Sequence, residues 1–281
     1  MIEIKGIAKN YKTKGKIIPA LKELSLSIKK GEIFGFLGPN GAGKTTTIKI
    51  MVDLIRADRG EVLINGISSL NPRSRESVGF LPEHPAYFDF LTGRELLRFA
   101  GRMHNAYDSK REEKLLKTFE LLDVADRQIR GYSKGMIQRL GFVVATVHDP
   151  DILILDEPMS GLDPTGRFIL KKRIKELKDE GKTIFFSSHI IPDVEELCDR
   201  VGIIDKGELI SLMDRRKMQD LTVRGFKIIY RDKGNIQEKI VDKNKLVSEL
   251  EILKRGMEIL NIEPVKRSLE EVFIEIVSKQ V

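Results

Sequence analysis

The sequence is poor in cysteine and in aromatic residues. It contains a single cysteine, Cys198, no tryptophan, and 6% aromatic residues in total. One cysteine excludes an internal disulfide bond, and no histidine or cysteine stands near Cys198 in the sequence to suggest a metal site. We therefore expect Cys198 to pack in the interior of a protein from a reducing compartment.

Long hydrophobic runs are also missing. The longest apolar stretch lies around residues 140–147, well short of the about 18–20 residues that cross a bilayer as a helix. The first residues, Met1–Lys5, do not have the pattern of a signal peptide, and the sequence shows no internal repeat or low-complexity segment. These absences predict a cytoplasmic protein without a membrane span, so any channel that it serves must be another chain.

The composition is typical of a soluble globular protein. Of the 281 residues, 41% are hydrophobic and 32% are charged, and this length accommodates one large α/β domain and a smaller one. The net charge of +7, from 49 basic and 42 acidic residues, is compatible with nucleic acid or with an anionic membrane surface. The basic residues stand among acidic ones, and no basic stripe with interleaved aromatics is present. We therefore expect solvated helix faces and no nucleic-acid partner.

The most informative segment is a glycine-rich stretch that matches the phosphate-binding pattern G-x-x-x-x-G-K-[ST]. It follows a predicted buried strand, residues 32–37, and precedes a predicted helix that begins near residue 46. In such a loop successive backbone N–H groups converge on a polyphosphate, and the helix start adds about half a positive charge. The residues expected to bind the nucleotide are Gly38, Pro39, Asn40, Gly41, Ala42, Gly43, Lys44, Thr45 and Thr46.

Two residues of this stretch have expected side-chain roles. Lys44 should reach the β- and γ-phosphates as a mobile point charge, and the Thr45 hydroxyl should ligate Mg²⁺. The alternative is a glycine-rich turn without a ligand, but turn chemistry alone does not require Gly-Lys-Thr at a helix start. ATP and Mg²⁺ are therefore the expected ligands.

A second polar group follows a continuous apolar run, Ile152–Leu155, which predicts a strand buried on both faces. Asp156 and Glu157 stand at the carboxyl end of this strand. We expect Asp156 to hold the Mg²⁺ shell and Glu157 to polarise the water that attacks the γ-phosphate. The alternative is an ordinary strand-to-turn boundary, because Asp156 and Pro158 both favour turns.

Three further motifs accompany these two nucleotide elements. They are Tyr132-Ser133-Lys134-Gly135-Met136-Ile137-Gln138-Arg139, Ser160-Gly161-Leu162-Asp163 and Ser187-Ser188-His189. In this order and spacing the five elements resemble the nucleotide-binding subunit of an ABC transporter, over roughly residues 1–215. The resemblance implies an α/β fold, a P-loop NTPase core with an antiparallel β subdomain and an inserted helical subdomain.

The resemblance also implies roles for single residues. Tyr11 matches the aromatic residue that stacks on adenine, with a strand-end tyrosine as the alternative. Ser133 and Gly135 match the signature residues that bind the γ-phosphate of ATP held by a second copy. His189 matches the switch histidine that contacts the γ-phosphate, with a structural histidine as the alternative. Asp163 matches the loop that crosses the dimer interface.

Two positions depart from the family pattern. Glu83 stands where many relatives carry glutamine in the loop that joins the core to the helical subdomain, and its carboxylate can still ligate Mg²⁺ as a hard oxygen ligand. Lys134 replaces a signature glycine at a helix start, where the helix dipole disfavours it and a nearby triphosphate favours it. A signature of the Tyr132–Met136 type together with Glu83 resembles those of a bacterial export subfamily.

We expect two domains. Residues 1–216 should form the ATP-binding domain, with the helical subdomain at about residues 84–150, where apolar residues recur at spacings of three and four. Residues 217–281 should form a small α+β accessory domain that starts with a hairpin and ends with a capped helix. The aromatic segment 85–90 is expected either in a groove that receives a helix of the membrane partner or in the core.

The sequence therefore predicts an ATP-hydrolysing subunit that dimerises on ATP and powers a separate transmembrane permease, most readily an exporter, on the cytoplasmic face of the membrane. The alternatives are a soluble ABC-type ATPase that acts on nucleic acid and a regulatory ATP switch. Nucleic-acid types usually insert a coiled coil or a zinc site between phosphate loop and signature, or carry two cassettes. Here only about ninety residues intervene, without heptads or cysteine pairs.

Overall fold

The computed structural model describes residues 1–13, 15–254 and 256–278, which fall into two units, Met1–Leu212 and Met213–Val281. The division lies within strand β10, whereas the sequence analysis placed it between Arg216 and Lys217. The first unit contains two sheets and the second contains one. Each unit is described by itself below.

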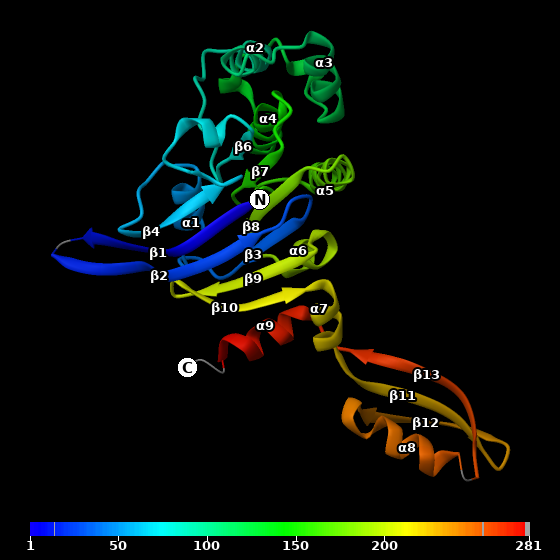
Figure 1. Cartoon of the computed structure of the whole chain (residues 1–281). Helices are drawn as coiled ribbons and strands as arrows, with labels where there is room; N and C mark the ends of the chain where they lie inside the picture. The colour runs from blue at the N-terminus through cyan, green and yellow to red at the C-terminus, as the bar shows by residue number, and fades with distance from the viewer. Residues whose placement is uncertain (14, 255, 279–281) are drawn as a thin grey trace. The chain divides into compact units, whose positions relative to one another are not determined.

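The first unit is built on a six-stranded sheet in the order β10-β9-β3-β8-β7-β6 (Figure 1). Four strand pairs in it, β3–β8, β3–β9, β7–β8 and β6–β7, are parallel. All residues of β3, β7 and β8 are buried, as the apolar runs predicted for a sheet covered on both faces. The strands are β3 (Ile33–Leu37), β6 (Val78–Leu81), β7 (Ile152–Leu155), β8 (Thr183–Ser188), β9 (Arg200–Asp205) and β10 (Glu208–Asp214).

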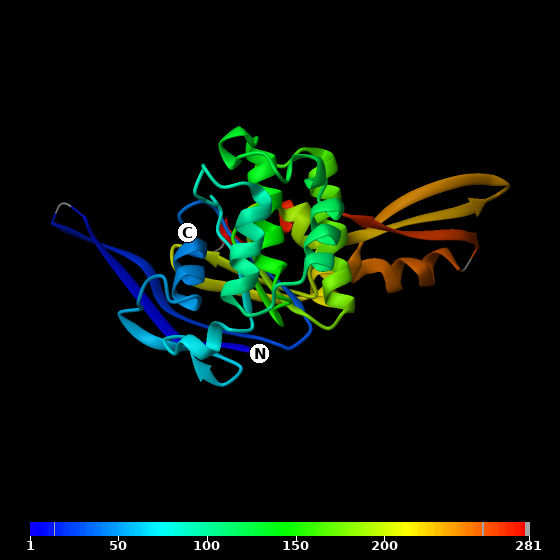
Figure 2. The ribbon, with the colours of Figure 1, turned by 90° about the horizontal axis from the view of Figure 1, so that it is seen from above.

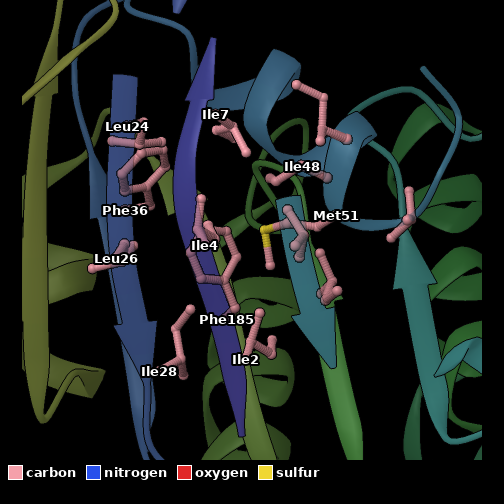
Figure 3. Close-up of a cluster of buried hydrophobic side chains, with 14 of the residues drawn as sticks. Ile2, Ile4, Ile7, Leu24, Leu26, Ile28, Phe36, Ile48, Met51 and Phe185 are labelled. Carbon is pink, nitrogen blue, oxygen red and sulfur yellow. The ribbon is translucent and has the colours of Figure 1, made fainter. Parts of the chain in front are cut away.

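An antiparallel sheet in the order β2-β1-β4-β5 accompanies it. Its strands are β1 (Ile2–Thr13), β2 (Lys16–Ile28), β4 (Arg59–Ile64) and β5 (Ile67–Ser68). Apolar side chains of β1 and β2 alternate with polar ones and face Phe36, Phe185 and helix α1 (Lys44–Met51), where they form the main core (Figure 3). The members labelled in the figure are Ile2, Ile4, Ile7, Leu24, Leu26, Ile28, Phe36, Ile48, Met51 and Phe185.

Three helices of the first unit follow strands of the central sheet. They are α1 (Lys44–Met51), α5 (Pro164–Asp179) and α6 (Ile191–Leu197). Each begins directly after one of the sequence motifs at the carboxyl end of a strand, namely after β3, β7 and β8. The sheet edge therefore collects the motifs that lie far apart in the sequence.

The predicted helical subdomain lies between β6 and β7. It contains α2 (Gly93–Met103), α3 (Ser109–Thr118) and α4 (Lys134–Thr146), which run side by side in Figure 2. The first helix starts only at Thr92, whose hydroxyl and backbone form a capping box with Glu95. The first residues of the expected helical range, near residue 84, are irregular. Short 3₁₀ turns occur at Pro72–Arg75, Leu122–Val124 and Ile129–Gly131.

The second unit contains a three-stranded antiparallel sheet in the order β12-β11-β13. The predicted hairpin is confirmed: Asp232 pairs with Asn235, and the two residues between them, Lys233 and Gly234, both have positive φ. The elements are α7 (Arg215–Thr222), β11 (Val223–Asp232), β12 (Asn235–Asp242), a 3₁₀ turn (Lys243–Lys245), α8 (Leu246–Leu253), β13 (Glu258–Lys266) and α9 (Leu269–Ser278).

Helix α7 explains why the boundary lies earlier than the sequence suggested. The carbonyl of Thr222 accepts a hydrogen bond of 2.7 Å from the backbone N–H of Arg267, and the Arg267 side chain donates to Leu221. Met218 is buried. The helix thus makes these hydrogen bonds within the second unit, although it follows the last family motif directly.

The fold class expected from the sequence, a P-loop NTPase core with an antiparallel sheet, an inserted helical subdomain and a small α+β unit, is confirmed. Among the described residues, no helix is both long enough and apolar enough to cross a bilayer.

Candidate nucleotide-binding site

The glycine-rich loop connects β3 to α1 and packs closely against β2 and β9. Gly43 has φ 112°, in the region that favours glycine, and a Cβ there would lie 2.8 Å from the carbonyl oxygen of Ala20 in β2. A Cβ on Gly38 would lie 2.3 Å from the carbonyl oxygen of Ile204 in β9. No described side chain caps α1. Its first N–H groups are therefore available to an anion.

Lys44 is folded back into this loop. Its Nζ donates to the carbonyl oxygens of Gly38 (2.7 Å) and Pro39 (3.2 Å) and lies 3.3 Å from Oε1 of Glu157. Only 6% of the lysine side chain is exposed. A buried ammonium group requires such partners, and a phosphate could replace them at this point.

Asp156 accepts hydrogen bonds from β8 and from the first turn of α1. Its Oδ1 accepts a hydrogen bond of 2.6 Å from the Ser187 hydroxyl, and the Thr45 hydroxyl also hydrogen-bonds to the carboxylate. Burial raises the pKa of Asp156 above its usual range, and the negative charges of Glu83 and Glu157 act in the same direction, against these hydrogen bonds. A cation beside Asp156 would relieve this excess of negative charge.

Glu157 follows in a strained conformation. Its φ of 46° lies in the left-handed region, which costs a residue with a Cβ about 1–2 kcal/mol. Its N–H donates to the Ser187 hydroxyl (2.8 Å), and its Oε2 lies 2.9 Å from Nδ1 of His189. Oε1 is buried and makes no hydrogen bond within the described chain. This oxygen forms an ion pair with Lys44 and can still accept a hydrogen bond from a further group.

These groups surround a cavity of about 280 Å³. Residues of the glycine-rich loop and two acidic residues, Glu83 and Glu157, line it together. Gly38 and Ala42 support the loop from behind, since Ala42 is 2% exposed and its carbonyl accepts from the Gly207 N–H. The lining residues are Ala20, Pro39, Asn40, Gly41, Gly43, Lys44, Thr45, Thr46, Glu83 and Glu157.

Three residues expected at the split site lie at helix starts, and none of them is among the described residues that line this cavity. Ser133 caps α4 by accepting from the Met136 N–H (3.2 Å), with Gly135 in the first turn. Asp163 caps α5 by accepting from the Gly166 N–H (3.0 Å). The two loops adjoin, because a Cβ on Gly135 would lie 3.4 Å from the carbonyl oxygen of Gly161.

Tyr11 lies on β1, opposite Ile18 of β2, and is 40% exposed. It too is outside the described lining of the cavity. The structure thus leaves the ring accessible but does not itself bring it against the glycine-rich loop.

Ser187 and Gln138 are the residues that sequence reasoning overlooked. Ser187 was part of a quoted motif, but only the parallel register of β7 and β8 brings its hydroxyl between Asp156 and the Glu157 N–H. Gln138 is 3% exposed, and its Nε2 donates to the carbonyl oxygen of Pro158 (3.2 Å). It links the signature helix to the segment that carries Glu157.

No group of three or more histidine, cysteine, aspartate or glutamate side chains in the described chain could hold a metal ion by itself. Thr45 and Asp156 lie together in this site, and Glu83 lines its cavity. These oxygen donors suit Mg²⁺, which takes few protein ligands and binds substrate phosphates as well.

The geometry agrees with comparisons against known proteins. A family model for ABC transporters matches residues 21–160. The YxlF protein of Bacillus subtilis, an uncharacterized ABC transporter ATP-binding protein, is 33% identical over 99% of both chains. This chain belongs to the ABC transporter family of ATP-binding proteins.

Two more comparisons extend this result. The ABC transporter ATP-binding protein sll0415 of Synechocystis is 43% identical over 75% of this chain, and the match spans 62% of that protein, so the chain covers less than two thirds of its length. Among solved structures, a dimeric post-hydrolysis state of the ATP-binding cassette MJ0796 with ADP and Pi superposes with a TM-score of 0.71 at 28% identity, over 77% of this chain and 99% of that one.

Proposed function

We propose that this chain is an ATP-hydrolysing subunit that powers a separate membrane permease. The observation that carries the proposal is the contact of Lys44 with Glu157 across the cavity, 3.3 Å from Nζ to Oε1. Lys44 and a buried carboxylate whose Oε1 accepts no hydrogen bond within the described residues line the same cavity. That is the arrangement needed to hold a terminal phosphate and to orient a water beside it.

The residues divide into groups by role. The backbone N–H groups from Gly38 to Thr46 and the Lys44 ammonium bind the triphosphate. Thr45, Asp156 and Glu83 would hold Mg²⁺, which would supply positive charge to the phosphates. Glu157 accepts a proton from the attacking water, and His189, 2.9 Å away, orients its carboxylate.

The site needs a second copy of the chain. Ser133, Gly135 and Asp163 lie outside the cavity's described lining and at exposed or half-buried positions. By family resemblance they complete the site of a partner subunit, so ATP would hold a head-to-tail homodimer together. The dimeric form of the MJ0796 cassette supports this proposal. Tyr11, on an accessible strand, stacks on the adenine ring.

An apolar groove on the helical subdomain is the proposed docking surface for the permease. It has a volume of about 460 Å³ and lies between the aromatic segment after β6 and helix α2. Phe88, Phe99 and Met103 line it with 65%, 55% and 69% of their surface exposed. Exposed apolar patches of this kind mark interaction sites. We therefore assign the segment 85–90 the interaction role; its Tyr87 also lines the groove, and burial raises the pKa of the Tyr87 hydroxyl.

The permease would place this subunit on the cytoplasmic face of the membrane. Export is the proposed direction because the Tyr132–Met136 signature and Glu83 resemble those of export-type relatives. The transported substrate would be selected by the permease and not by this chain.

The test is Mg²⁺-dependent ATP hydrolysis by the purified chain with and without Lys44→Ala. We expect the substitution to remove nucleotide binding and hydrolysis, because it deletes the one buried cation of the phosphate loop. Lys49→Ala is the matched control, since Lys49 lies exposed on the same helix. Equal activity of Lys44→Ala and Lys49→Ala would exclude this site.

A further inference from the structure

Helices α5 and α6 begin directly after the two segments that the proposed reaction uses. Asp163 ends the interface loop, defined here as Ser160–Asp163, and caps α5. His189 is followed by Ile190, the residue before α6 (Ile191–Leu197). A fixed distance between the first turns of the two helices therefore fixes the interface loop relative to His189.

An ion pair between the buried Asp193 and the half-buried Arg167 joins these first turns. Arg167 Nη2 donates to Oδ2 of Asp193 at 2.7 Å, and Asp193 is 2% exposed. Arg167 lies one turn after Asp163 and donates its backbone N–H to the Asp163 carbonyl (2.9 Å), while Asp193 lies one turn after His189. The pair thus connects residues that are one helical turn from each functional segment.

Other charges complete the surroundings of Asp193. Lys171, on the next turn of α5, donates to Oδ1 of Asp193 (2.8 Å) and to Glu196 (2.7 Å). Burial alone would lower the pKa of Lys171, yet these two carboxylates hold it above its usual value. The Nε of Arg167 is buried and makes no hydrogen bond within the described residues, so its guanidinium depends on the contact with Asp193.

Stability alone is a poor explanation for this arrangement. Removing two charges from water costs about as much as their attraction returns, and apolar side chains of similar size often stabilise a fold better. A guanidinium and a carboxylate do provide direction, because their hydrogen bonds fix the distance and orientation of the two backbones. Such a pair defines a position more sharply than an apolar contact does.

We infer that Arg167 and Asp193 are positioning residues that hold His189 in register with the interface loop, so that a second copy closing on that loop acts on the switch histidine. The inference rests on the proposed function for its consequence in catalysis. Its structural part, that Arg167 sets the position of His189, holds in the isolated chain and can be tested there.

The same two helices provide a matched control. Lys175 Nζ and Glu196 Oε1 also join α5 to α6, at 2.7 Å, but they lie farther from both segments and are 48% and 45% exposed. If a link between the helices were all that mattered, losing either pair would have a similar effect. If position at the first turn matters, loss of the Arg167–Asp193 pair should have the larger effect.

The first measurement is NMR of the imidazole ring protons. The chain has four histidines, so His189 can be assigned from a His189→Gln variant. We expect Arg167→Gln to shift or broaden the His189 resonances, Lys175→Gln to leave them unchanged, and Arg167→Lys to restore them in part. Asp193→Asn, which keeps the shape of the side chain, gives the same test should Arg167→Gln unfold. Unchanged His189 resonances in a folded Arg167→Gln or Asp193→Asn variant would overturn the inference.

The second measurement is ATP hydrolysis with thermal melting as the control for folding. We expect Arg167→Gln to lower kcat about tenfold with little change in KM, because a displaced catalytic geometry reduces turnover more than binding. A fall in melting temperature without a fall in kcat would show a purely structural pair and overturn the inference. An inactive wild-type chain would count against the proposed function only, since the NMR comparison would still decide whether Arg167 positions His189.

Discussion

Nδ1 of His189 lies 2.9 Å from Oε2 of Glu157, and the other carboxylate oxygen lies 3.3 Å from Nζ of Lys44. The two contacts hold the proposed base between the switch residue and the phosphate-binding residue. They arise because β7 and β8 are adjacent parallel strands whose ends place Glu157 and His189 side by side. A nucleotide that binds Lys44 must therefore compete with Glu157 for the ammonium group. Once Lys44 is bound to the nucleotide, His189 is the side chain that still contacts Glu157.

The first prediction concerns this histidine. His189→Ala should lower ATP turnover about 10²-fold, because Glu157 loses the group that orients it, while ATP affinity stays nearly unchanged. His189 is 49% exposed, so its loss should not change the melting temperature. Three measurements separate these effects. Phosphate release gives turnover, calorimetry gives nucleotide affinity, and thermal melting gives stability. Lys49→Ala, at an exposed position of α1, is the control; a lower melting temperature for His189→Ala than for wild type would favour a structural histidine.

The second prediction concerns the hydroxyl that sequence reasoning overlooked. Ser187→Ala should leave the Glu157 N–H without its acceptor and Asp156 without one of its two hydroxyl donors. A buried polar group left unpaired costs about 1–3 kcal/mol, so we expect a lower free energy of unfolding and hydrolysis reduced at least tenfold. Ser187→Thr retains the hydroxyl and should recover part of both. Chemical denaturation and ATP turnover measure the two; wild-type hydrolysis by Ser187→Ala would show that the strained turn does not need this support.

The third prediction concerns stability at acid pH. The rings of His148 and His104 stack with centroids 3.8 Å apart. Burial, followed by repulsion from His104, lowers the pKa of His148 to about 4. An unfolded histidine titrates near pH 6.5. Between these values the unfolded chain binds a proton that the folded chain does not, so stability is complete above about pH 6.5 and is lost as the pH falls toward 4.

His148→Phe should therefore flatten the fall in stability between about pH 6.5 and pH 4. The expected difference is about 1 kcal/mol, because solvent reaches the half-buried ring and screens part of the effect. Urea denaturation across this pH range measures it. His84→Gln, at an exposed position, is the matched control. If His148→Phe and wild type lose stability in parallel, the stacked pair does not titrate as the structure indicates.

Segments whose structure depends on local sequence were the easiest to predict. The run Ile152–Leu155 is the strand β7 in the structure, and the loop between Gly38 and Lys44 joins a strand to a helix as its pattern required. In both cases one segment contains the whole signal, because burial on both faces selects continuous apolar residues and the phosphate loop selects glycine.

Contacts between distant segments could not be predicted from the sequence. Nothing near Ser187 indicates that it bridges Asp156 and Glu157, because this follows from the register of two parallel strands. The same holds for Arg167 and Asp193, which the sequence presents as ordinary helix charges, whereas in the structure they form an ion pair with Asp193 buried. The domain boundary was placed late because α7 follows the last family motif, whereas Thr222 bonds to Arg267.

The last prediction concerns the split site. Ser133 caps α4 outside the cavity that Lys44 lines, so neither half alone completes the surroundings of a γ-phosphate. Glu157→Gln should block hydrolysis while preserving ATP binding, and it should therefore trap a dimer that light scattering detects. Adding Ser133→Arg should return the trapped protein to monomer, because it places bulk against the triphosphate of the partner.

Mixing two defective chains sharpens this test. A Lys44→Ala chain still offers an intact Ser133, and a Ser133→Arg chain still offers an intact Lys44, so a mixed dimer in the Glu157→Gln background has one complete composite site. Each chain alone should remain monomeric with ATP, whereas the mixture should form a dimer that retains about one nucleotide per pair. A mixture that stays monomeric while Glu157→Gln alone dimerises would mean that both sites must close together; a Glu157→Gln protein that stays monomeric at saturating ATP would contradict the homodimer itself.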